Sequence, residues 1–562
     1  MMMSDFPPGL VLILGAFLLP IISQKFRPIL TLGLPVVALY LIWNLPNGVF
    51  ATIPLFDYQL SLVRSDALSR IFATVFSIMT FGGSLYALKQ KSVLELSAVF
   101  VYAGSAIGAV FAGDLISLFV FWELMAVAST LIVLSVRSKH SLQTSIRYFL
   151  VHVFGGTLLL VGILAHILDT GSTAFNAMEP NTFGTILIMA GFLINAAAPP
   201  LSAWLSDAYP EASFSGAVFL SAFTTKTAVY VLLRGFPGAD ILIYIGIFMI
   251  FYGIIYALLE NDMRRILAYS IVNQVGFMVT GIGIGTDMAL NGVAAHAFTH
   301  IIYKALLLMS AGSVLYMTGK RKCTDLGGLF QSMPLTAICG IIGALSISSF
   351  PLTSGFISKS MISQAAADQS LTTVWFFLMA ASAGVFLHAG IKFPWFVFFQ
   401  KDSGMRPSDP PWSMRLAMLL FSGICIGLGV FPEYLYAMLP YEVTYKPYTV
   451  THVIHMLQLL LFSGFAFFLM LPWMKRTLTI TLDADWIYRR AVPNVLQKMF
   501  SVIWQLDRSL RDALKLKLNL YLSYFSGKSG RLSILLSQNH PSGSMVMWVA
   551  VVLATYLLLS FI

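Results

Sequence analysis

The stretch HAFTHIIYKALLLMSAGSV, residues 296–314, decides what kind of fold this chain adopts. It is mostly apolar, and its length suits a helix that crosses a lipid bilayer, which takes about 20 residues. His296, His300 and Lys304 follow one another at intervals of four, so they share one face of such a helix. An ionisable group at the middle of a membrane is costly and marks a functional position by default. The stretch therefore predicts a membrane-spanning helix with a row of basic side chains.

Composition extends the membrane prediction to the whole chain. Of its 562 residues, 58% are apolar and only 10% are charged, whereas soluble proteins carry roughly a quarter charged residues. The net charge of +10 does not indicate binding to nucleic acid, because no soluble basic domain carries it. The widely spaced Cys323, Cys339 and Cys425 predict core packing rather than a disulfide framework.

Apolar stretches of spanning length recur along the chain, so we expect an all-α integral membrane protein with about sixteen transmembrane helices. The predicted spans are 9–23, 28–46, 67–88, 93–112, 115–135, 145–168, 183–200, 217–235, 241–259, 265–285, 288–317, 335–362, 371–398, 415–438, 452–473 and 545–561. The first has no basic flank of a signal peptide and is expected to remain. Lys and Arg gather in alternate loops, for example at Lys89, Arg137 and Lys320. This bias predicts that the N-terminus lies outside the cell.

Three of these spans contain helix-breaking residues. Span 335–362 holds Phe350, Pro351 and Gly355, span 371–398 holds Gly390 and Pro394, and span 217–235 is short and ends in a Gly-Pro turn at 235–238. Proline removes a backbone donor and glycine loosens the helix. Interrupted helices in transporters often lie at ion sites, and a simple packing kink is the alternative.

Residues 475–544 form the one long polar stretch. From 485 to 525, apolar side chains recur at helical spacing among Lys and Arg, a pattern typical of an amphipathic helix on a membrane surface. The predicted orientation makes this stretch cytoplasmic. Two interpretations stay open: a helix that only contacts anionic lipid, and a lateral strut that contacts a neighbouring subunit.

Four charged residues lie deep within predicted spans. They are Glu123, Lys226, Lys304 and Lys392, and structural ion pairing is the alternative to a functional role. His388 lies four residues before Lys392 and shares its helix face, although a lone histidine there is more often a core residue. Because histidine changes its charge near neutral pH, such rows can pass protons by way of water.

Other chemistry has little support in the sequence. His296 and His300 have the spacing of a zinc pair, but no HExxH glutamate and no third ligand accompany them, so we expect no metal. The chain has no P-loop, no GxSxG and no CxxCH, and the glycines at 281–285 follow no predicted strand. We therefore expect a transporter subunit without a cofactor, not an enzyme.

Seven motifs, in order, resemble those of antiporter-like proton-channel subunits, which occur in respiratory complex I, membrane-bound hydrogenases and Mrp-type cation/proton antiporters. They are FVFWELM (119–125), PPLSAWLSDAYPEAS (199–213), SAFTTKTAVYVLLR (221–234), NDMRRILAYSIVNQVGFM (261–278), HAFTHIIYKALLLMSAGSV (296–314), DLGGL (325–329) and FPLTSGFISK (350–359). HAGIKFPWFVFF (388–399) most resembles the D-type subunit of multisubunit Na⁺/H⁺ antiporters of the Mrp class. The chain departs from the family pattern at Ser202, Ser206 and Arg264, where the family has histidine, proline and often lysine.

The resemblance implies two inverted five-helix repeats, each with a charged half-channel. Glu123 with Lys226 would serve the first, with Glu123 influencing Lys226 through charge pairing. His296, His300 and Lys304 with Lys392 would serve the second. The secondary candidates are His388, Lys359, Asp207 and Arg264.

The expected organisation of the chain follows from these repeats. Residues 1–112 are N-terminal transmembrane helices, 113–260 the first half-channel region, 261–400 the second, 401–474 further transmembrane helices, 475–544 the cytoplasmic amphipathic lateral helix, and 545–562 the final transmembrane helix.

The function implied by the resemblance is that of a proton-translocating subunit of a multisubunit Na⁺ or K⁺/H⁺ antiporter in the cell (inner) membrane. Its expected partners are other subunits of the complex, the transported ions and the bilayer. The alternative is a proton-pumping subunit of a redox-driven complex, similar to NADH-quinone oxidoreductase or to a membrane-bound hydrogenase. A stand-alone secondary transporter is favoured less, because no signature of a substrate pocket is present.

Overall fold

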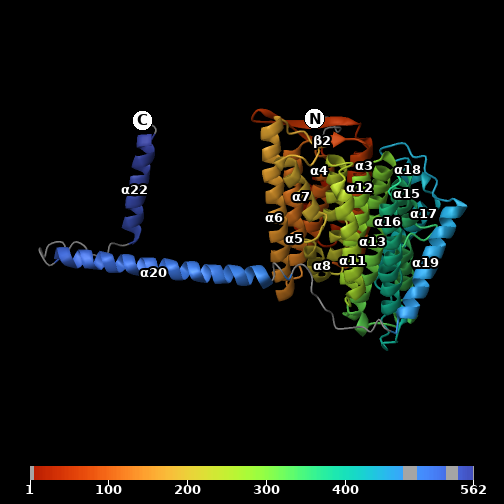
Figure 1. Ribbon diagram of the computed structural model, residues 1–562. Helices are drawn as coiled ribbons and strands as arrows, with labels where there is room; N and C mark the ends of the chain where they lie inside the picture. Colours follow the sequence, from red (N-terminus) through yellow and green to blue (C-terminus); the bar gives the residue numbers. More distant parts are fainter. Residues whose placement is uncertain (1–5, 473–485, 487–489, 527–541, 561–562) are drawn as a thin grey trace. The chain divides into compact units, whose positions relative to one another are not determined.

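A computed structural model describes residues 6–472, 486, 490–526 and 542–560 of the chain (Figure 1). These residues form two compact units, Met1–Asp485 and Trp486–Ile562. The first unit is a bundle of helices with one small hairpin at one end, and it holds every candidate site residue.

The helices of the first unit follow the apolar stretches of the sequence. In the first part of the chain they are α1 (Pro8–Leu18), α2 (Arg27–Asn44), α3 (Ala67–Tyr86), α4 (Val93–Phe111), α5 (Leu115–Leu134), α6 (Lys139–Thr170), α7 (Phe183–Asn195), α8 (Ala203–Ala208), α9 (Gly216–Leu220) and α10 (Thr224–Gly235). They continue with α11 (Ile241–Leu259), α12 (Met263–Ile284), α13 (Asp287–Thr318), α14 (Pro334–Ile347), α15 (Ser354–Asp368), α16 (Thr372–Val385), α17 (Trp412–Val430), α18 (Glu433–Tyr436) and α19 (Val450–Met470).

The membrane prediction is confirmed in its coarse form. Within the described part of the chain, twelve helical segments are long and apolar enough to cross a membrane. Three more apolar helices, α1, α7 and α14, are shorter than a full span. The total of sixteen spans stays a prediction.

A two-stranded hairpin, which the sequence reasoning missed, lies at one end of the bundle (Figure 1). Strands β1 (Gly48–Leu55) and β2 (Tyr58–Ser65) pair antiparallel, from Gly48 opposite Ser65 to Leu55 opposite Tyr58. A carboxylate oxygen of Asp114 accepts the backbone N–H of Ser61 at 2.7 Å and ties the hairpin to the start of α5. This hairpin marks one end of the bundle, called here the hairpin end.

One predicted helix break is present, since residues 348–353 separate α14 from α15. Span 217–235 ends at Gly235 as expected, but it also contains a break that was not predicted, at residues 221–223 between α9 and α10. The third predicted break has an unexpected form. After α16, the chain continues in two π-helical segments, Phe386–Lys392 and Trp395–Phe399, on either side of Pro394. A π-helix holds one extra residue per turn and is common at functional sites.

The centre of the bundle is built from α10, α12 and α13. Every residue of α10 is buried, and so is nearly all of α12. Glycines allow α11 and α12 to pack closely: a Cβ on Gly253 would lie only 2.6 Å from the backbone nitrogen of Asn273. Outer helices such as α2 and α19 instead expose most of their apolar side chains, as helices that face lipid do. The buried basic residues therefore lie in the best-packed part of the molecule.

The second unit consists of α20 (Val492–Ser526) and α22 (Ser542–Ser560). Helix α20 has 35 residues, about 52 Å at 1.5 Å per residue. It covers most of the predicted amphipathic stretch 485–525, whereas residues 475–485, 487–489 and 527–541 of the predicted 475–544 segment lie outside the described residues.

Candidate functional site

Lys226 lies at the break between α9 and α10. Residues 221–223 leave the helical hydrogen-bond pattern, so the carbonyl of Ser221 is free to accept a side-chain donor. Lys226 Nζ donates to this oxygen at 2.7 Å and to Thr225 Oγ1 at 3.0 Å. The lysine side chain is fully buried. The break thus compensates a buried amine with backbone oxygen, as interrupted membrane helices do around ions.

His296 begins the row on α13 and is held from two other helices. Its Nδ1 lies 3.0 Å from Ser358 Oγ of α15, and its Nε2 lies 3.1 Å from Gln274 Oε1 of α12. The amide nitrogen of Gln274 donates to Asn273 Oδ1, which turns the Gln274 oxygen toward the imidazole. Both ring nitrogens of His296 are therefore engaged in a defined orientation.

His300, one turn further along α13, has no such partners. Its side chain is fully buried, yet neither ring nitrogen has a hydrogen-bond partner among the described residues. Its ring centroid is 6.1 Å from that of His296 and 5.2 Å from that of Tyr303. Leaving a buried polar group unsatisfied costs about 1–3 kcal/mol. A buried polar group without a protein partner can be satisfied by water, and an imidazole can exchange protons with water.

Lys304 completes the row. Its Nζ donates one hydrogen bond, to Ser270 Oγ of α12 at 2.8 Å, and its side chain is fully buried. Lys304 interacts electrostatically with Lys226 and with both His300 and His388. The row predicted on one helix face thus interacts electrostatically with Lys226 and with His388 of the π-helical segment.

Lys392 differs from the other two lysines. Its Nζ donates to the backbone carbonyls of Ala257 (3.1 Å), Leu258 (2.6 Å) and Glu260 (2.5 Å). These oxygens lie at the carboxyl end of α11, where the helix leaves carbonyls unpaired and its dipole favours a cation. Lys392 therefore caps α11 with all three hydrogens of an ammonium group.

His388 lies on the same π-helical segment as Lys392. Its Nδ1 is 2.9 Å from the carbonyl oxygen of Gly384, and its buried Nε2 has no hydrogen-bond partner among the described residues. It interacts electrostatically with Lys304 and Lys392.

Glu123 is half-buried on α5 and packs against α6. A Cβ on Gly156 would lie 1.8 Å from Glu123 Oε1, so the carboxylate occupies the space that this glycine leaves. Oε1 has no hydrogen-bond partner within the described ranges. No ion pair joins Glu123 to Lys226 there either, since Lys226 donates to Ser221 and Thr225. The direct contact implied by charge pairing is not made, and any influence of Glu123 on Lys226 acts over a distance.

Two of the secondary candidates lie at the bundle end opposite the hairpin and hold loops. Asp207 accepts two hydrogen bonds from Arg147, at 2.9 and 3.1 Å. Arg264 is buried and donates to four backbone carbonyls within residues 209–213. The hydrogen-bond partners described for them lie in α6 and in residues 209–213, away from the row on α13, and favour a structural role.

Lys359, the remaining secondary candidate, lies near the row. Its Nζ donates to the carbonyl of Ile347, the last residue of α14, at 3.1 Å, and lies 4.7 Å from the ring centroid of Phe277. Its chain neighbour Ser358 contacts His296. Lys359 thus repeats the arrangement of Lys226, a lysine that donates to a carbonyl freed by a helix break.

Sequence reasoning overlooked one buried acid, Glu95, near the start of α4. It is 2% exposed and accepts hydrogen bonds from Ser213 and Ser215 at Oε1 and from Ser135 at Oε2. It ties α4 to the segment that leads into α9.

An ion-paired acid marks the hairpin end. Asp66 precedes α3, and both of its oxygens accept from Arg234 at 2.8 Å. Burial alone would raise the pKa of Asp66, but Arg234, a hydrogen bond from the Ser69 backbone and Arg64 together hold it below its ordinary value. This cluster fastens α3 to α10.

No group of three or more His, Cys, Asp or Glu side chains within the described residues is placed to hold a metal ion. Membrane-length helices that surround several buried basic side chains define the class, a multi-pass membrane protein. Comparisons with known proteins narrow that class.

The family model described as "NADH:quinone oxidoreductase/Mrp antiporter, TM" matches residues 112–386. The D-type subunit of the Na⁺/H⁺ antiporter of Alkalihalophilus pseudofirmus is 30% identical over 337 residues, which are 56% of this chain and 67% of that protein. The chain belongs to this family of antiporter-like membrane subunits.

Two solved structures share the fold. A chain of the Mrp complex from a Dietzia species superposes with a TM-score of 0.68 and 20% identity, over 78% of this chain and 96% of that one. A chain of the membrane-bound sulfane sulfur reductase, an archaeal respiratory membrane complex, superposes with a TM-score of 0.69 and 22% identity, over 77% and 95%. The match confirms the helical membrane fold expected from the motifs.

Proposed function

We propose that this chain is the proton-translocating subunit of a multisubunit Na⁺ or K⁺/H⁺ antiporter. Protons move through the bundle along Lys226, His296, His300, Lys304 and Lys392, with Glu123 as the acidic group of the first half. The observation that carries the proposal is His300, a fully buried imidazole without a hydrogen-bond partner among the described residues. It lies between His296 and Lys304 along α13 and interacts electrostatically with both and with Lys226.

The hydrogen bonding of two lysines supports a repeated design. Lys226 and Lys359 each donate to a carbonyl at a helix break, one in each proposed half. The proposed repeats, the sixteen spans and the domain limits at 112, 260, 400, 474 and 544 follow the family pattern.

The bias of Lys and Arg toward alternate loops supports an N-terminus outside the cell and a cytoplasmic 475–544 segment.

The test compares two buried histidines. His300→Gln should lower Na⁺- or K⁺-driven ΔpH in everted membrane vesicles at least tenfold. His152→Gln is the matched control, because His152 on α6 is also buried with its Nε2 unpartnered, but lies outside the proposed pathway. Equal activity of both variants, at equal membrane insertion, would overturn the proposal.

A proton-pumping subunit of a redox-driven complex is the second candidate. The structural similarity to a subunit of a respiratory complex favours it. Purification of the intact complex separates the two: iron–sulfur or quinone-linked partner subunits would favour the redox-driven pump, and partners without redox groups the antiporter. A Na⁺ or K⁺ gradient that drives ΔpH in vesicles without any electron donor would exclude the redox-driven pump.

A further inference from the structure

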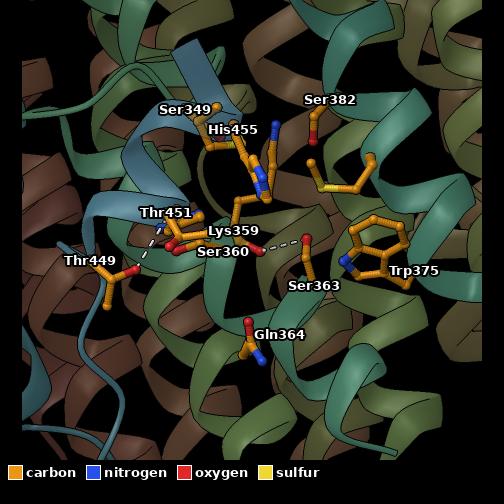
Figure 2. A pocket seen from close by; sticks show the side chains of 13 residues that line it. Ser349, Lys359, Ser360, Ser363, Gln364, Trp375, Ser382, Thr449, Thr451 and His455 are labelled. Carbon is orange, nitrogen blue, oxygen red and sulfur yellow. Dashed lines mark hydrogen bonds between the residues drawn. The ribbon is translucent and has the colours of Figure 1, made fainter. Parts of the chain in front are cut away.

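A cavity of about 310 Å³ lies between α15, α16 and the first turns of α19, and none of the basic residues on α13 lines it. Figure 2 shows the side chains around it: Lys359 and Ser363 from α15, Trp375 and Ser382 from α16, and Thr449, Thr451 and His455 around the start of α19. We call it the Lys359 cavity. At about 30 Å³ per molecule, its volume corresponds to about ten waters. It therefore has room for a polyatomic ion.

Lys359 is a buried amine whose hydrogen bonds are incomplete. It is 1% exposed, and within the described part of the chain its Nζ donates one hydrogen bond, to the carbonyl of Ile347 at 3.1 Å. An ammonium group has three hydrogens, and Lys392 uses all three of its own. No carboxylate of the described residues interacts with Lys359. Because a buried charge is costly unless it is paired, Lys359 calls for an anionic partner.

The lining of the Lys359 cavity is basic or neutral. Lys359, His452 and His455 line it, and no lining residue within the described ranges is acidic. Asp368 lies nearby and accepts a hydrogen bond from Gln364 at 2.8 Å, but it is exposed and does not line the cavity. A hollow lined by charge of one sign attracts ions of the opposite sign. The lining therefore suits an anion and supplies none of its own.

Helix α19 begins at the cavity, since Thr449, Thr451 and His452 all line it. Thr449 Oγ1 accepts the backbone N–H of His452 at 3.3 Å, whereas the N–H groups of Val450 and Thr451 have no acceptor among the described residues. Free N–H groups and the helix dipole make the start of a helix favourable for anions, phosphate among them. This end of α19 thus adds donors to the same cavity.

Ser349 is an independent sign of a missing ligand. It lies in the break between α14 and α15, lines the cavity and is 1% exposed, yet its Oγ has no hydrogen-bond partner within the described residues. Three other serines of the lining donate to carbonyls of their own helices, namely Ser360, Ser363 and Ser382. Ser349 and Lys359 are therefore buried donors that the protein leaves partly or wholly unused, and an anion would satisfy both.

We propose that the Lys359 cavity binds an oxyanion of the phosphate class, held by Lys359, Ser349 and the first N–H groups of α19. A phosphate group has several acceptor oxygens, so it can accept from donors on separate elements at once. Both α16 and α19 are outer helices with most of their residues unburied, so the phosphate can belong to an anionic phospholipid or be a free ion. The inference goes beyond the proposed function, because it concerns a bound anion and not the movement of protons.

The experiment counts the phosphate that the full-length chain holds after purification with its partner subunits. Equilibrium binding of ³²P-orthophosphate, in a sulfonate buffer of constant ionic strength, measures the free ion. Native mass spectrometry measures the retained phospholipid. Lys359→Gln removes the charge, and Ser363→Glu places a carboxylate in the cavity as an internal partner for Lys359. Lys446→Gln is the matched control, since Lys446 is exposed in the loop before α19 and does not line the cavity.

We expect the wild type to hold one more phosphate group per chain, free or lipid-borne, than either cavity variant. Where orthophosphate binding is measured, Lys359→Gln should weaken it at least about tenfold, because a hydrogen-bonded charge is lost. Lys446→Gln should bind like the wild type. Ser363→Glu keeps the test decisive if Lys359→Gln does not fold, because it leaves the lysine in place.

Added phosphatidylglycerol, with phosphatidylcholine as the neutral comparison, separates the two sources. Phosphatidylglycerol that displaces the labelled phosphate and is retained by the wild type assigns the site to a lipid headgroup. Label that neither lipid displaces assigns it to the free ion, and both results support a phosphate site. Equal phosphate and phospholipid contents in the wild type and both cavity variants would overturn the inference. So would an equal loss of binding in Lys446→Gln, which would show a response to net charge alone.

Discussion

Gly156→Ala would move the carboxylate of Glu123 without changing any charge. The added Cβ would lie 1.8 Å from Glu123 Oε1, whereas a carbon and an oxygen in close contact lie about 3.3 Å apart. The carboxylate must therefore retreat by roughly 1.5 Å. Because it ends a flexible side chain, it can do so by changing its rotamer while α5 and α6 stay in place.

The expected result is a loss of transport without a loss of protein. Alanine favours a helix over glycine by about 1 kcal/mol, so α6 should be no less stable. Transfer between positioned groups is sensitive to displacements of about 1 Å, and we expect cation-driven ΔpH to fall about ten- to hundredfold. The measurement is initial ΔpH formation in everted vesicles, normalised to the amount of inserted subunit.

Gly155→Ala is the matched control, one position earlier on α6. Its Cβ would lie 3.1 Å from Ile194 Cγ2, so a shift of a few tenths of an ångström accommodates it, and Glu123 is untouched. Near-normal activity is expected there. Glu123→Ala supplies the reference for complete loss of the carboxylate. If Gly156→Ala transports like wild type while Glu123→Ala is inactive, the position of the carboxylate does not matter and the geometric reasoning is refuted.

Two further predictions concern stability. Lys392→Met leaves the carbonyls of Ala257, Leu258 and Glu260 without their donor, so it should destabilise the subunit by about 3 kcal/mol or more and lower the Tm of the purified complex. Lys392→Arg keeps a donor and should have a Tm closer to that of the wild type. An unchanged Tm in Lys392→Met would show that the lysine does not cap α11. The pKa of Asp66 is held below its ordinary value by Arg234 despite burial, so its ion pair stabilises the protein above about pH 4 and the benefit is lost as the pH falls through the lowered pKa. The Tm difference between wild type and Asp66→Asn should therefore be present at pH 6 and shrink below pH 4, and a difference that does not change with pH would contradict this assignment.

The sequence predicted the features that depend on one helix at a time. The spacing of His296, His300 and Lys304 places them on one face of any α-helix, and α13 confirms that geometry. Pro351 lacks a backbone donor, and the break between α14 and α15 follows from it. Apolar runs predicted the spanning helices because bilayer thickness fixes their length.

Features that depend on packing between helices escaped prediction. Gln274, Ser270 and Ser358 are ordinary polar residues in their own helices, and only the packing of α12 and α15 against α13 makes them partners of the row. Lys392 looked like a mid-membrane charge, but the π-helical turn brings it to the end of α11. Glu123 looked like the partner of Lys226, yet each side chain lies against its own neighbours.

The unequal hydrogen bonding of the basic residues bears on how the proposed pathway works. Lys304 interacts electrostatically with Lys226, His300 and His388, and Lys226 interacts with His300. Because all four side chains are positive when protonated, a proton on one disfavours a proton on its neighbour in a low-dielectric core. His300 has no partner within the described residues that would fix its protonation state, whereas the three carbonyls around Lys392 favour an ammonium group. In the proposed function, His300 is therefore the group that exchanges protons most readily, and Lys392 is the pathway lysine whose ammonium form is held by the most hydrogen bonds. Replacing His300 should consequently slow transfer itself, while replacing Lys392 should change both the stability of α11 and the electrostatic bias on the row.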